Sequence, residues 1–263
     1  MHAMKITFVN PGIEKMLENI LLFQTDGTAA FWYEPLFYFY PQLDKARALS
    51  MRGEERKNYL ARELRQAYAG LEKTIDEKVV LYSRHWERCR PQVTAALSDA
   101  FKVDCATMFN DIKCSVTMNP IAPRFLRQRA FDVFYLNSEK GAVGMALHEI
   151  IHFVWFHVWH ETFDDSYDEY ESPSLKWILS EMAVEPVMHD RRLSEINPYF
   201  PKEQGGCVYP YFYTMEIEGA CILDTLGQMY AALPIRAFME SSYAYCRRYE
   251  AQIREHIRRA EGQ

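Results

Sequence analysis

The sequence lacks the features that mark exported, membrane-spanning and disulfide-stabilised proteins. Its first ten residues, MHAMKITFVN, contain neither the basic nor the apolar region of a secretory signal peptide. No run of eighteen apolar residues occurs, so we expect no segment to span a membrane. The six cysteines are scattered without a C-x-x-C pair, which favours reduced thiols in the core or on the surface. Together these absences predict a cytoplasmic protein.

Positive charge is not in excess either. Lys and Arg number 30 against 36 Asp and Glu, which gives a net charge of −6. This balance argues against general nucleic-acid binding and against attachment to an anionic membrane surface. The composition, with 49% hydrophobic and 25% charged residues, is typical of a folded protein rather than a disordered one. We therefore expect neither nucleic acid nor membrane among its partners.

No internal repeat or low-complexity linker divides the chain. At 263 residues it is long enough to bury a substantial core as one domain. We expect a single domain over residues 1–263. The alternative is two tightly packed lobes, a mainly helical part at 1–110 and a part at 111–263 that carries the motif described below.

Most of the chain has helical patterns, and a few short stretches have the pattern of strands. Lys5 to Val9 is strand-like and is followed by a helix through Leu22. Residues 53–101 carry long helical patterns rich in Arg, Glu, Ala and Leu, with a break near Pro91. Two further helices close the chain, at about 214–231 and 235–259.

A small sheet is predicted ahead of a buried helix. Ile112 to Met118 and Phe131 to Leu136 are strand-like runs that we expect to pair as a hairpin. The stretch GAVGMALHEIIHFVWFHVW follows, contains no proline and is apolar at helical spacing, with Asn137 or Ser138 as its N-cap. The predicted fold class is therefore α+β, predominantly helical, with a small sheet ahead of this helix.

The most informative motif is HEIIH, from His148 to His152. Two histidines four positions apart lie on one face of an α-helix, so both imidazoles can reach one metal ion. Glu149 lies beside them and could act on a metal-bound water. This is the H-E-x-x-H signature of zinc peptidases, in which the glutamate is the general base. A buried helix with these three groups needs a partner for them, and a metal ion would be that partner.

Catalytic zinc usually has three protein ligands and an open position for water. Glu181 is the strongest candidate for the third ligand, on a helix that we expect to begin with Ser172 as cap and Pro173 as first residue. Glu185 lies one turn further along the same face. We expect Glu181 to bind the metal and Glu185 to accept the other N–H of a ligand histidine, which fixes the imidazole tautomer. The alternative is an ordinary pair of solvated glutamates.

Other residues near the motif fit the ligand role less well. His157 and His160 lie on the same helix, but they point to other faces or lie about 12 Å along its axis. We expect them at packing or rim positions. Asp164 or Asp165 could supply an aspartate ligand, although the surrounding DDSYDEYE is more typical of a solvated loop.

His148, Glu149, His152 and a glutamate on a following helix together resemble the gluzincin class of zinc metallopeptidases. The resemblance covers roughly residues 112–190 and implies a zincin-like fold that binds Zn²⁺. It also implies an edge strand ahead of the motif helix that pairs with an extended peptide substrate, and Phe131 to Leu136 is the expected edge. The gap between the second histidine and the glutamate is longer than in thermolysin-like members, so we expect no close relationship to those.

The resemblance implies a zinc-dependent hydrolase acting on a peptide or protein substrate. Glu149 would take a proton from the metal-bound water and pass it to the leaving amine. Related enzymes add a donor to the oxyanion, for which Tyr209, Tyr211 and Tyr213 are candidates and Tyr211 is our choice. Two alternatives stay open: a zinc-binding regulatory or structural protein without hydrolysis, and a zinc hydrolase of a non-peptide amide. Glu149 favours an enzyme, because binding alone does not need it.

Overall fold

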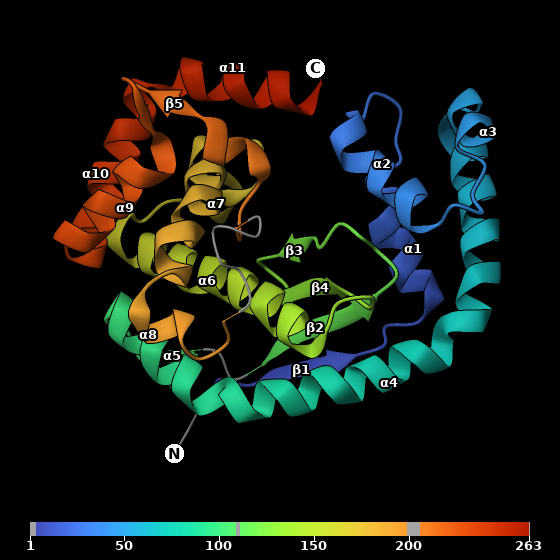
Figure 1. Ribbon diagram of the computed structural model, residues 1–263, viewed down its shortest axis with the longest axis horizontal. Coiled ribbons are helices and arrows are strands. Elements are labelled where there is room, and N and C mark those ends of the chain that lie inside the picture. The colour runs from blue at the N-terminus through green and yellow to red at the C-terminus, as the bar shows by residue number, and fades with distance from the viewer. Residues whose placement is uncertain (1–3, 109–110, 199–205, 263) are drawn as a thin grey trace. The chain divides into compact units, whose positions relative to one another are not determined.

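The structure is a computed structural model that describes residues 4–108, 111–198 and 206–262. Helices predominate beside a small mixed sheet, which confirms the predicted α+β class (Figure 1). The chain divides into two compact units, each assembled from distant segments. We call them the sheet unit, made of Ile6–His85, Ile112–Ala142 and Glu261–Gln263, and the helical unit, made of Met1–Lys5, Trp86–Asp111 and Val143–Ala260. This division differs from lobes at 1–110 and 111–263.

The sheet unit contains four strands in the order β1-β2-β4-β3. The first two are β1 (Ile6–Val9) and β2 (Ile112–Thr117), and the others are β3 (Arg124–Phe125) and β4 (Ala130–Phe134). β1, β2 and β4 are parallel to one another, and β3 runs antiparallel to β4. The expected hairpin of β2 and β4 is therefore wrong. About a dozen residues join these strands, which is long enough to return the chain for parallel pairing.

The expected edge at Phe131 to Leu136 is wrong for its first two residues, Phe131 and Asp132, which have backbone partners on both sides. β4 lies between β2 and β3, and Phe131 pairs with Cys114 on one side and Arg124 on the other. The backbone N–H of Asp132 also donates to the carbonyl oxygen of Pro123 at 3.1 Å. At this side of the sheet the outer strand is β3. The sequence pattern shows which residues are buried, but it does not show which strand comes last.

Helices α1 (Ile13–Leu21), α2 (Ala30–Phe39) and α3 (Lys45–Ser50) also belong to the sheet unit. The predicted strand and helix at the N-terminus are confirmed by β1 and α1. Buried polar groups tie these elements to the sheet: the Asn19 side chain of α1 donates to the Asp132 carboxylate of β4 at 2.8 Å. The buried hydroxyl of Tyr82 lies 2.8 Å from the Tyr135 carbonyl oxygen and 2.7 Å from that of Asn137.

The long helix α4 (Gly53–Phe101) continues through Pro91, where the sequence predicts a break. A proline inside a helix removes one hydrogen bond and costs about 3 kcal/mol. Trp86, Val93 and Leu97 on the same helix are fully buried, and each such side chain contributes about 1.5–3 kcal/mol. The buried stripe on both sides of the proline therefore outweighs the local cost, and the helix stays continuous.

All or most of seven helices belongs to the helical unit: α5 (Cys105–Met108), α6 (Glu139–Phe163), α7 (Leu175–Met188), α8 (Arg191–Ser194), α9 (Ile222–Ala232), α10 (Ile235–Arg248) and α11 (Glu250–Glu261). Short 3-10 helices at Tyr167–Tyr170 and Pro210–Thr214 and the two-strand hairpin of β5 (Glu216–Ile217) and β6 (Ala220–Cys221) complete it. α7 packs against α9 and α10. The closing helices number three rather than the two expected, because Tyr249 interrupts the second.

Helix caps follow the sequence in one case and depart from it in another. The Ser138 hydroxyl accepts a hydrogen bond from the backbone N–H of Gly141 at 3.1 Å, which confirms it as the cap of α6. α7 is capped by Ser174, whose hydroxyl accepts from the Trp177 N–H at 3.0 Å, and not by Ser172. Both serines precede the same apolar run, so spacing alone does not distinguish them.

Helix α6 is the core of the helical unit. Among the described residues, it is the one helix long and apolar enough to cross a membrane by length and composition, with a mean hydropathy of 1.2. However, 89% of that segment is buried inside the structure, as in the core helix of a globular protein. Trp155 packs edge-on against Phe238 of α10, and Trp159 against Tyr243 of the same helix. Protein side chains thus cover its apolar surface.

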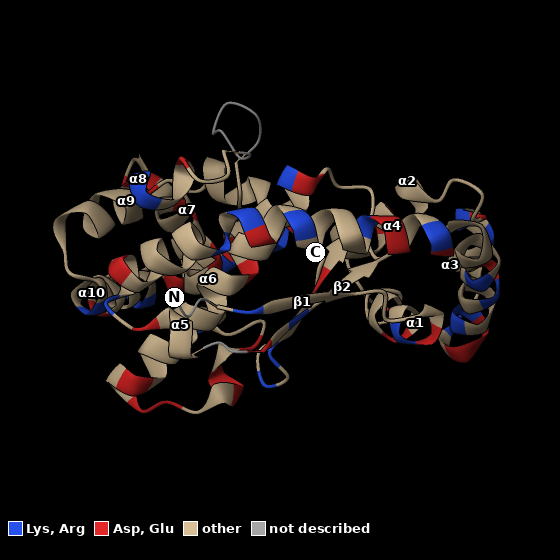
Figure 2. Cartoon of the chain, turned by 90° about the horizontal axis from the view of Figure 1, so that it is seen from below, with Lys and Arg blue, Asp and Glu red and all other residues tan. Residues whose placement is uncertain are grey.

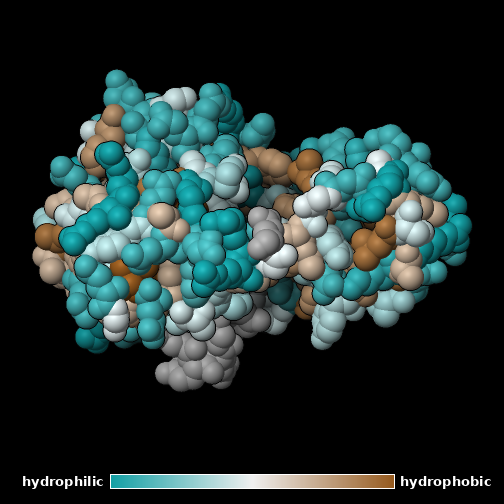
Figure 3. All heavy atoms as spheres, turned by 90° about the horizontal axis from the view of Figure 1, so that it is seen from above, coloured by the Kyte–Doolittle hydropathy of each residue, from teal (hydrophilic) through white to brown (hydrophobic). Residues whose placement is uncertain are grey.

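The outer surface is mainly polar. Figure 2 shows Lys and Arg alternating with Asp and Glu along α4, where pairs such as Lys57–Glu54 and Arg90–Glu87 lie one turn apart. The face in Figure 3 is mostly hydrophilic, with small hydrophobic areas. The exposed large hydrophobic residues in the described ranges all belong to the sheet unit: Leu22, Tyr38, Phe39, Val80, Leu81 and Leu136.

Replacing Tyr82 with Phe should lower the free energy of unfolding by about 1 kcal/mol, because buried carbonyl oxygens lose a hydrogen-bond donor. The measurement is urea unfolding followed by circular dichroism. Tyr38→Phe is the control, since Tyr38 is 79% exposed and should leave the midpoint unchanged. Equal stability of Tyr82→Phe and the parent would show that the hydroxyl contributes nothing to holding the end of β4.

Candidate metal centre

The two histidines of the HEIIH motif lie one turn apart on the buried face of α6. Their Nε2 atoms are 3.1 Å from each other, and both side chains are buried. This arrangement follows from the helical period, because positions i and i+4 share a face. Two imidazole nitrogens at this distance in a protein interior require a cation or a proton between them.

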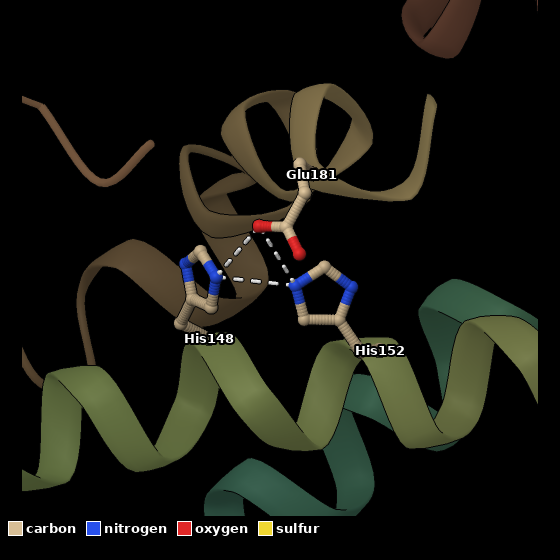
Figure 4. Close-up of side chains that lie close together, drawn as sticks. All are labelled: His148, His152 and Glu181. Carbon is tan, nitrogen blue, oxygen red and sulfur yellow. Dashed lines mark hydrogen bonds and ion pairs between the residues drawn. The ribbon is translucent and has the colours of Figure 1, made fainter. Parts of the chain in front are cut away.

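Glu181 of α7 completes the cluster (Figure 4). Its Oε2 atom lies 3.4 Å from Nε2 of His148 and 3.4 Å from Nε2 of His152. The carboxylate is as buried as the histidines, at 3% exposure. The structure therefore brings together the three residues selected from sequence, and they form a group that could hold a metal ion.

The distances between the three ligand atoms fit a tetrahedral ion. In a tetrahedral site with bonds of about 2.0–2.1 Å, two ligand atoms are about 3.3 Å apart. The three separations here are 3.1, 3.4 and 3.4 Å. Three corners of such a site are thus already in place.

Glu149 lies beside this cluster without belonging to it. Its Oε1 atom is 4.0 Å from Nε2 of His148, and its side chain is buried. The carboxylate is therefore close to the edge of the cluster. That position suits a group that acts on a molecule bound at the fourth corner, and it differs from the position of a ligand.

The second ring nitrogen of His148 is held by the backbone. Nδ1 lies 2.9 Å from the carbonyl oxygen of Cys207, which can only accept, so Nδ1 carries the proton and Nε2 presents its lone pair to the cluster. Contacts of this kind orient a metal-binding imidazole. Sequence reasoning missed Cys207, because the contact is through its backbone and residue type does not reveal it.

The expected contact of Glu185 with a ligand histidine is wrong. Its Oε2 atom instead accepts from the Tyr213 hydroxyl at 2.5 Å and from the Cys207 thiol at 3.1 Å. The Tyr213 oxygen in turn accepts from the Cys207 N–H at 3.0 Å. Burial, followed by the hydrogen bond to Glu185, raises the pKa of Tyr213 well above its usual range. Glu185 therefore supports the segment whose carbonyl orients His148.

Gly206 makes this network sterically possible. Its φ of +67° is in the left-handed region, and a Cβ atom there would lie 1.6 Å from the Tyr213 hydroxyl oxygen. A glycine is needed for both reasons. In the sequence, the glycine directly before CVYPYFY indicates an unusual backbone conformation or a close contact, but it does not identify Tyr213 as the residue in contact.

Tyr211, our choice as oxyanion donor, is buried in the 3-10 helix at Pro210–Thr214. Its ring stacks on that of Tyr209, with centroids 5.4 Å apart, and its carbonyl oxygen accepts from Nε2 of His256 at 2.9 Å. Its catalytic role stays a prediction. The Tyr213 hydroxyl donates to the Glu185 carboxylate, so its hydrogen bond has a structural role and is not directed at an oxyanion.

The rival ligands have other partners. Nε2 of His157 is 3.1 Å from the Glu161 carboxylate, and Nδ1 of His160 is 2.6 Å from the Asp165 carbonyl oxygen. The Asp165 carboxylate accepts from the Trp159 indole at 2.8 Å and pairs with Lys176 at 2.6 Å. Asp164 is exposed. None of these four belongs to a candidate metal cluster of the described residues.

Comparisons of the chain with protein-family models, with curated proteins and with solved structures each find no match. The assignment of this cluster as a candidate metal site therefore rests on its own geometry. It is compatible with a zincin motif at His148, Glu149, His152 and Glu181, and the likeness to gluzincins is carried by these four residues alone.

Gly206→Ala should destabilise the protein by more than the cost of a positive φ, because the new methyl group displaces Tyr213. Gly219→Ala is a matched control, since Gly219 has a φ of +79° and nothing within 4 Å of its added Cβ. We expect a loss of about 1 kcal/mol for the control and at least about 2 kcal/mol for Gly206→Ala in urea unfolding. Equal losses would refute the steric role.

The Asp165–Lys176 pair predicts a pH dependence of stability. Burial tends to raise the pKa of Asp165. Hydrogen bonds from Lys176 and Trp159 lower this pKa by a larger amount, so the net pKa lies below the usual value of 3.8. Its stabilisation is therefore present above about pH 3.8 and is lost as the pH falls through the folded-state pKa. Asp165→Asn should cost about 1–2 kcal/mol at pH 7.

The difference between Asp165→Asn and the parent should shrink when unfolding is measured at decreasing pH. The exposed neighbour provides the control, and Asp164→Asn should follow the parent at every pH. A constant difference between Asp165→Asn and the parent down to strongly acidic pH would contradict the assignment.

Proposed function

We propose that the protein is a zinc-dependent metallopeptidase of gluzincin type. The observation that carries the proposal is the convergence of two imidazole nitrogens and one carboxylate oxygen, 3.1–3.4 Å apart, with the Glu149 carboxylate 4.0 Å from one of them. His148, His152 and Glu181 would hold the ion. Metal binding alone would not need Glu149, so its position supports hydrolysis rather than a purely regulatory or structural role.

The donor set supports zinc as the metal. Two neutral imidazoles and one carboxylate are the ligands of many catalytic zinc sites, whereas Ca²⁺ and Mg²⁺ prefer oxygen ligands only. Zinc bound there would lower the pKa of a coordinated water and polarise the substrate carbonyl. The Cys207 carbonyl keeps His148 in the tautomer that ligation needs.

Glu149 is the proposed general base. Its carboxylate accepts a proton from the attacking water and delivers it to the leaving amine. Only 3% of Glu149 is exposed, so bulk water does little to screen the electrostatic interactions that accompany this proton transfer. Tyr211 is proposed as the donor that stabilises negative charge on the carbonyl oxygen.

The proposed substrate is a peptide or protein, and the proposed location is the cytoplasm. Pairing of the substrate with Phe131 to Leu136 is not part of the proposal, because Phe131 and Asp132 at the start of that stretch already have backbone partners on both sides. Substrate selection therefore has to come from other parts of the chain.

The test uses the purified chain of 263 residues and a peptide library read by mass spectrometry. Cleavage should stop after chelation and return with zinc. Glu149→Gln should lower the rate by about 10²–10⁴-fold, while zinc still raises the thermal unfolding temperature as in the parent. Glu161→Gln is the control on the same helix, with a side chain 47% exposed, and should retain activity.

Two outcomes would overturn the proposal. An unmodified protein that binds zinc yet cleaves no peptide would favour a zinc-binding regulator, or a hydrolase of other amides if such a substrate is cleaved. Full activity in His152→Ala would show that the cluster on α6 is not the reaction centre.

A further inference from the structure

A second group of metal-ligand side chains lies in the helical unit. Glu185 and His189 come from the end of α7, and Cys207 comes from the segment before the 3-10 helix at Pro210–Thr214. Each offers one ligand atom, and these atoms lie within 4.8 Å of one another. None of the three is a ligand of the first cluster.

The contacts within the group are close. Cys207 Sγ is 3.1 Å from Oε2 of Glu185. Nδ1 of His189 is 3.4 Å from Oε1 of the same carboxylate and donates to the Glu185 carbonyl oxygen at 2.9 Å, a hydrogen bond that a metal ion at Nδ1 would replace. Glu185 and His189 are four positions apart, so the helical period places them on one face. The group thus combines sulfur, nitrogen and oxygen donors around one carboxylate.

An independent feature of Glu185 points to a ligand. The side chain is 2% exposed, and its Oε1 atom is buried without accepting a hydrogen bond from any residue in the described ranges. The other oxygen, Oε2, is the one that accepts from Tyr213 and Cys207. A buried carboxylate oxygen without a donor costs about 1–3 kcal/mol, and a cation at Oε1 would remove that cost.

A cavity of about 660 Å³ reaches this group. Glu185 and His189 both line it, together with Asp190, Asp224 and Gln228, and all of these residues belong to the helical unit. The cavity gives an ion a path to the buried carboxylate. It also leaves room for a water or another small ligand at a fourth coordination position.

We propose that Glu185, His189 and Cys207 form a second metal site, for a divalent cation of the zinc class. Thiolate and imidazole donors select zinc, cobalt and related ions over calcium and magnesium. When the ion binds, the Cys207 thiol releases its proton to solvent. A metal–sulfur bond then replaces the hydrogen bond from Cys207 to Glu185.

The second site and the first cluster share Cys207. Its carbonyl oxygen accepts from His148, while its sulfur belongs to the second group. An ion at the second site therefore fixes the backbone that orients a ligand of the first. The two sites still differ in one measurable property, because the first contains no sulfur.

The test is a titration of the metal-free protein, residues 1–263, with Co²⁺. A thiolate bound to cobalt gives a charge-transfer absorption band in the near ultraviolet, which a site of two histidines and a glutamate cannot give. The parent protein should show this band at a stoichiometry of one per chain. His152→Ala, which removes a ligand of the first cluster, should retain it.

Variants then assign the ligands. Cys207→Ser should abolish the band, and His189→Ala should weaken cobalt binding at least about 100-fold, beyond the usual effect of an outer contact. His189 is partly exposed, so that variant should fold even if Cys207→Ser does not. Cys221→Ser is the control, since Cys221 lies outside the group, and should keep the full band.

Two results would overturn the second site. One is the absence of a thiolate band in folded parent protein at saturating Co²⁺. The other is a band of unchanged affinity in folded His189→Ala or Cys207→Ser. Neither result depends on catalysis. The second site can therefore be refuted while the proposed peptidase activity is confirmed, and the peptidase activity can be refuted while the second site is confirmed.

Discussion

Burial of three ionisable side chains at one point is the constraint on which the helical unit depends. α6 and α7 are apolar over most of their surfaces, yet His148, His152 and Glu181 meet between them with little exposure. An isolated polar group in such surroundings costs about 1–3 kcal/mol, and an isolated charge costs more. The three groups offset this cost by sharing a cation or a proton, so the packing of the two helices and the chemistry of the cluster are linked.

The segment from Gly206 to Thr214 extends that link beyond the two helices. Its backbone orients His148 through the Cys207 carbonyl, and its tyrosine and thiol contact Glu185 on α7. One carboxylate thereby connects the end of α7 to the histidine on α6. Residues that are distant in sequence position the cluster without touching its centre, which is how outer contacts usually tune a metal site.

Local features of the fold could be predicted because they depend on local physics. The 3.6-residue period placed His148 and His152 on one face, and Ser138 capped α6 as its hydroxyl allows. Glu181 was selected because catalytic zinc usually has a third protein ligand and this carboxylate lies on the following helix. The histidine pair and the cap use neighbours within one or two turns, where the chain itself fixes the geometry, whereas the contact of Glu181 with the histidines depends on the packing of α7 against α6.

Tertiary structure decided the remaining features. The order of the strands placed β4 inside the sheet, since hydrophobic alternation reports burial and not which strand is next. α4 continued through Pro91 because distant side chains bury the residues around it. The Glu185 carboxylate accepts hydrogen bonds from Tyr213 and Cys207, because a segment about twenty residues further along the chain packs against the end of α7. The sequence by itself determined which groups need a partner, and long-range packing chose the partner.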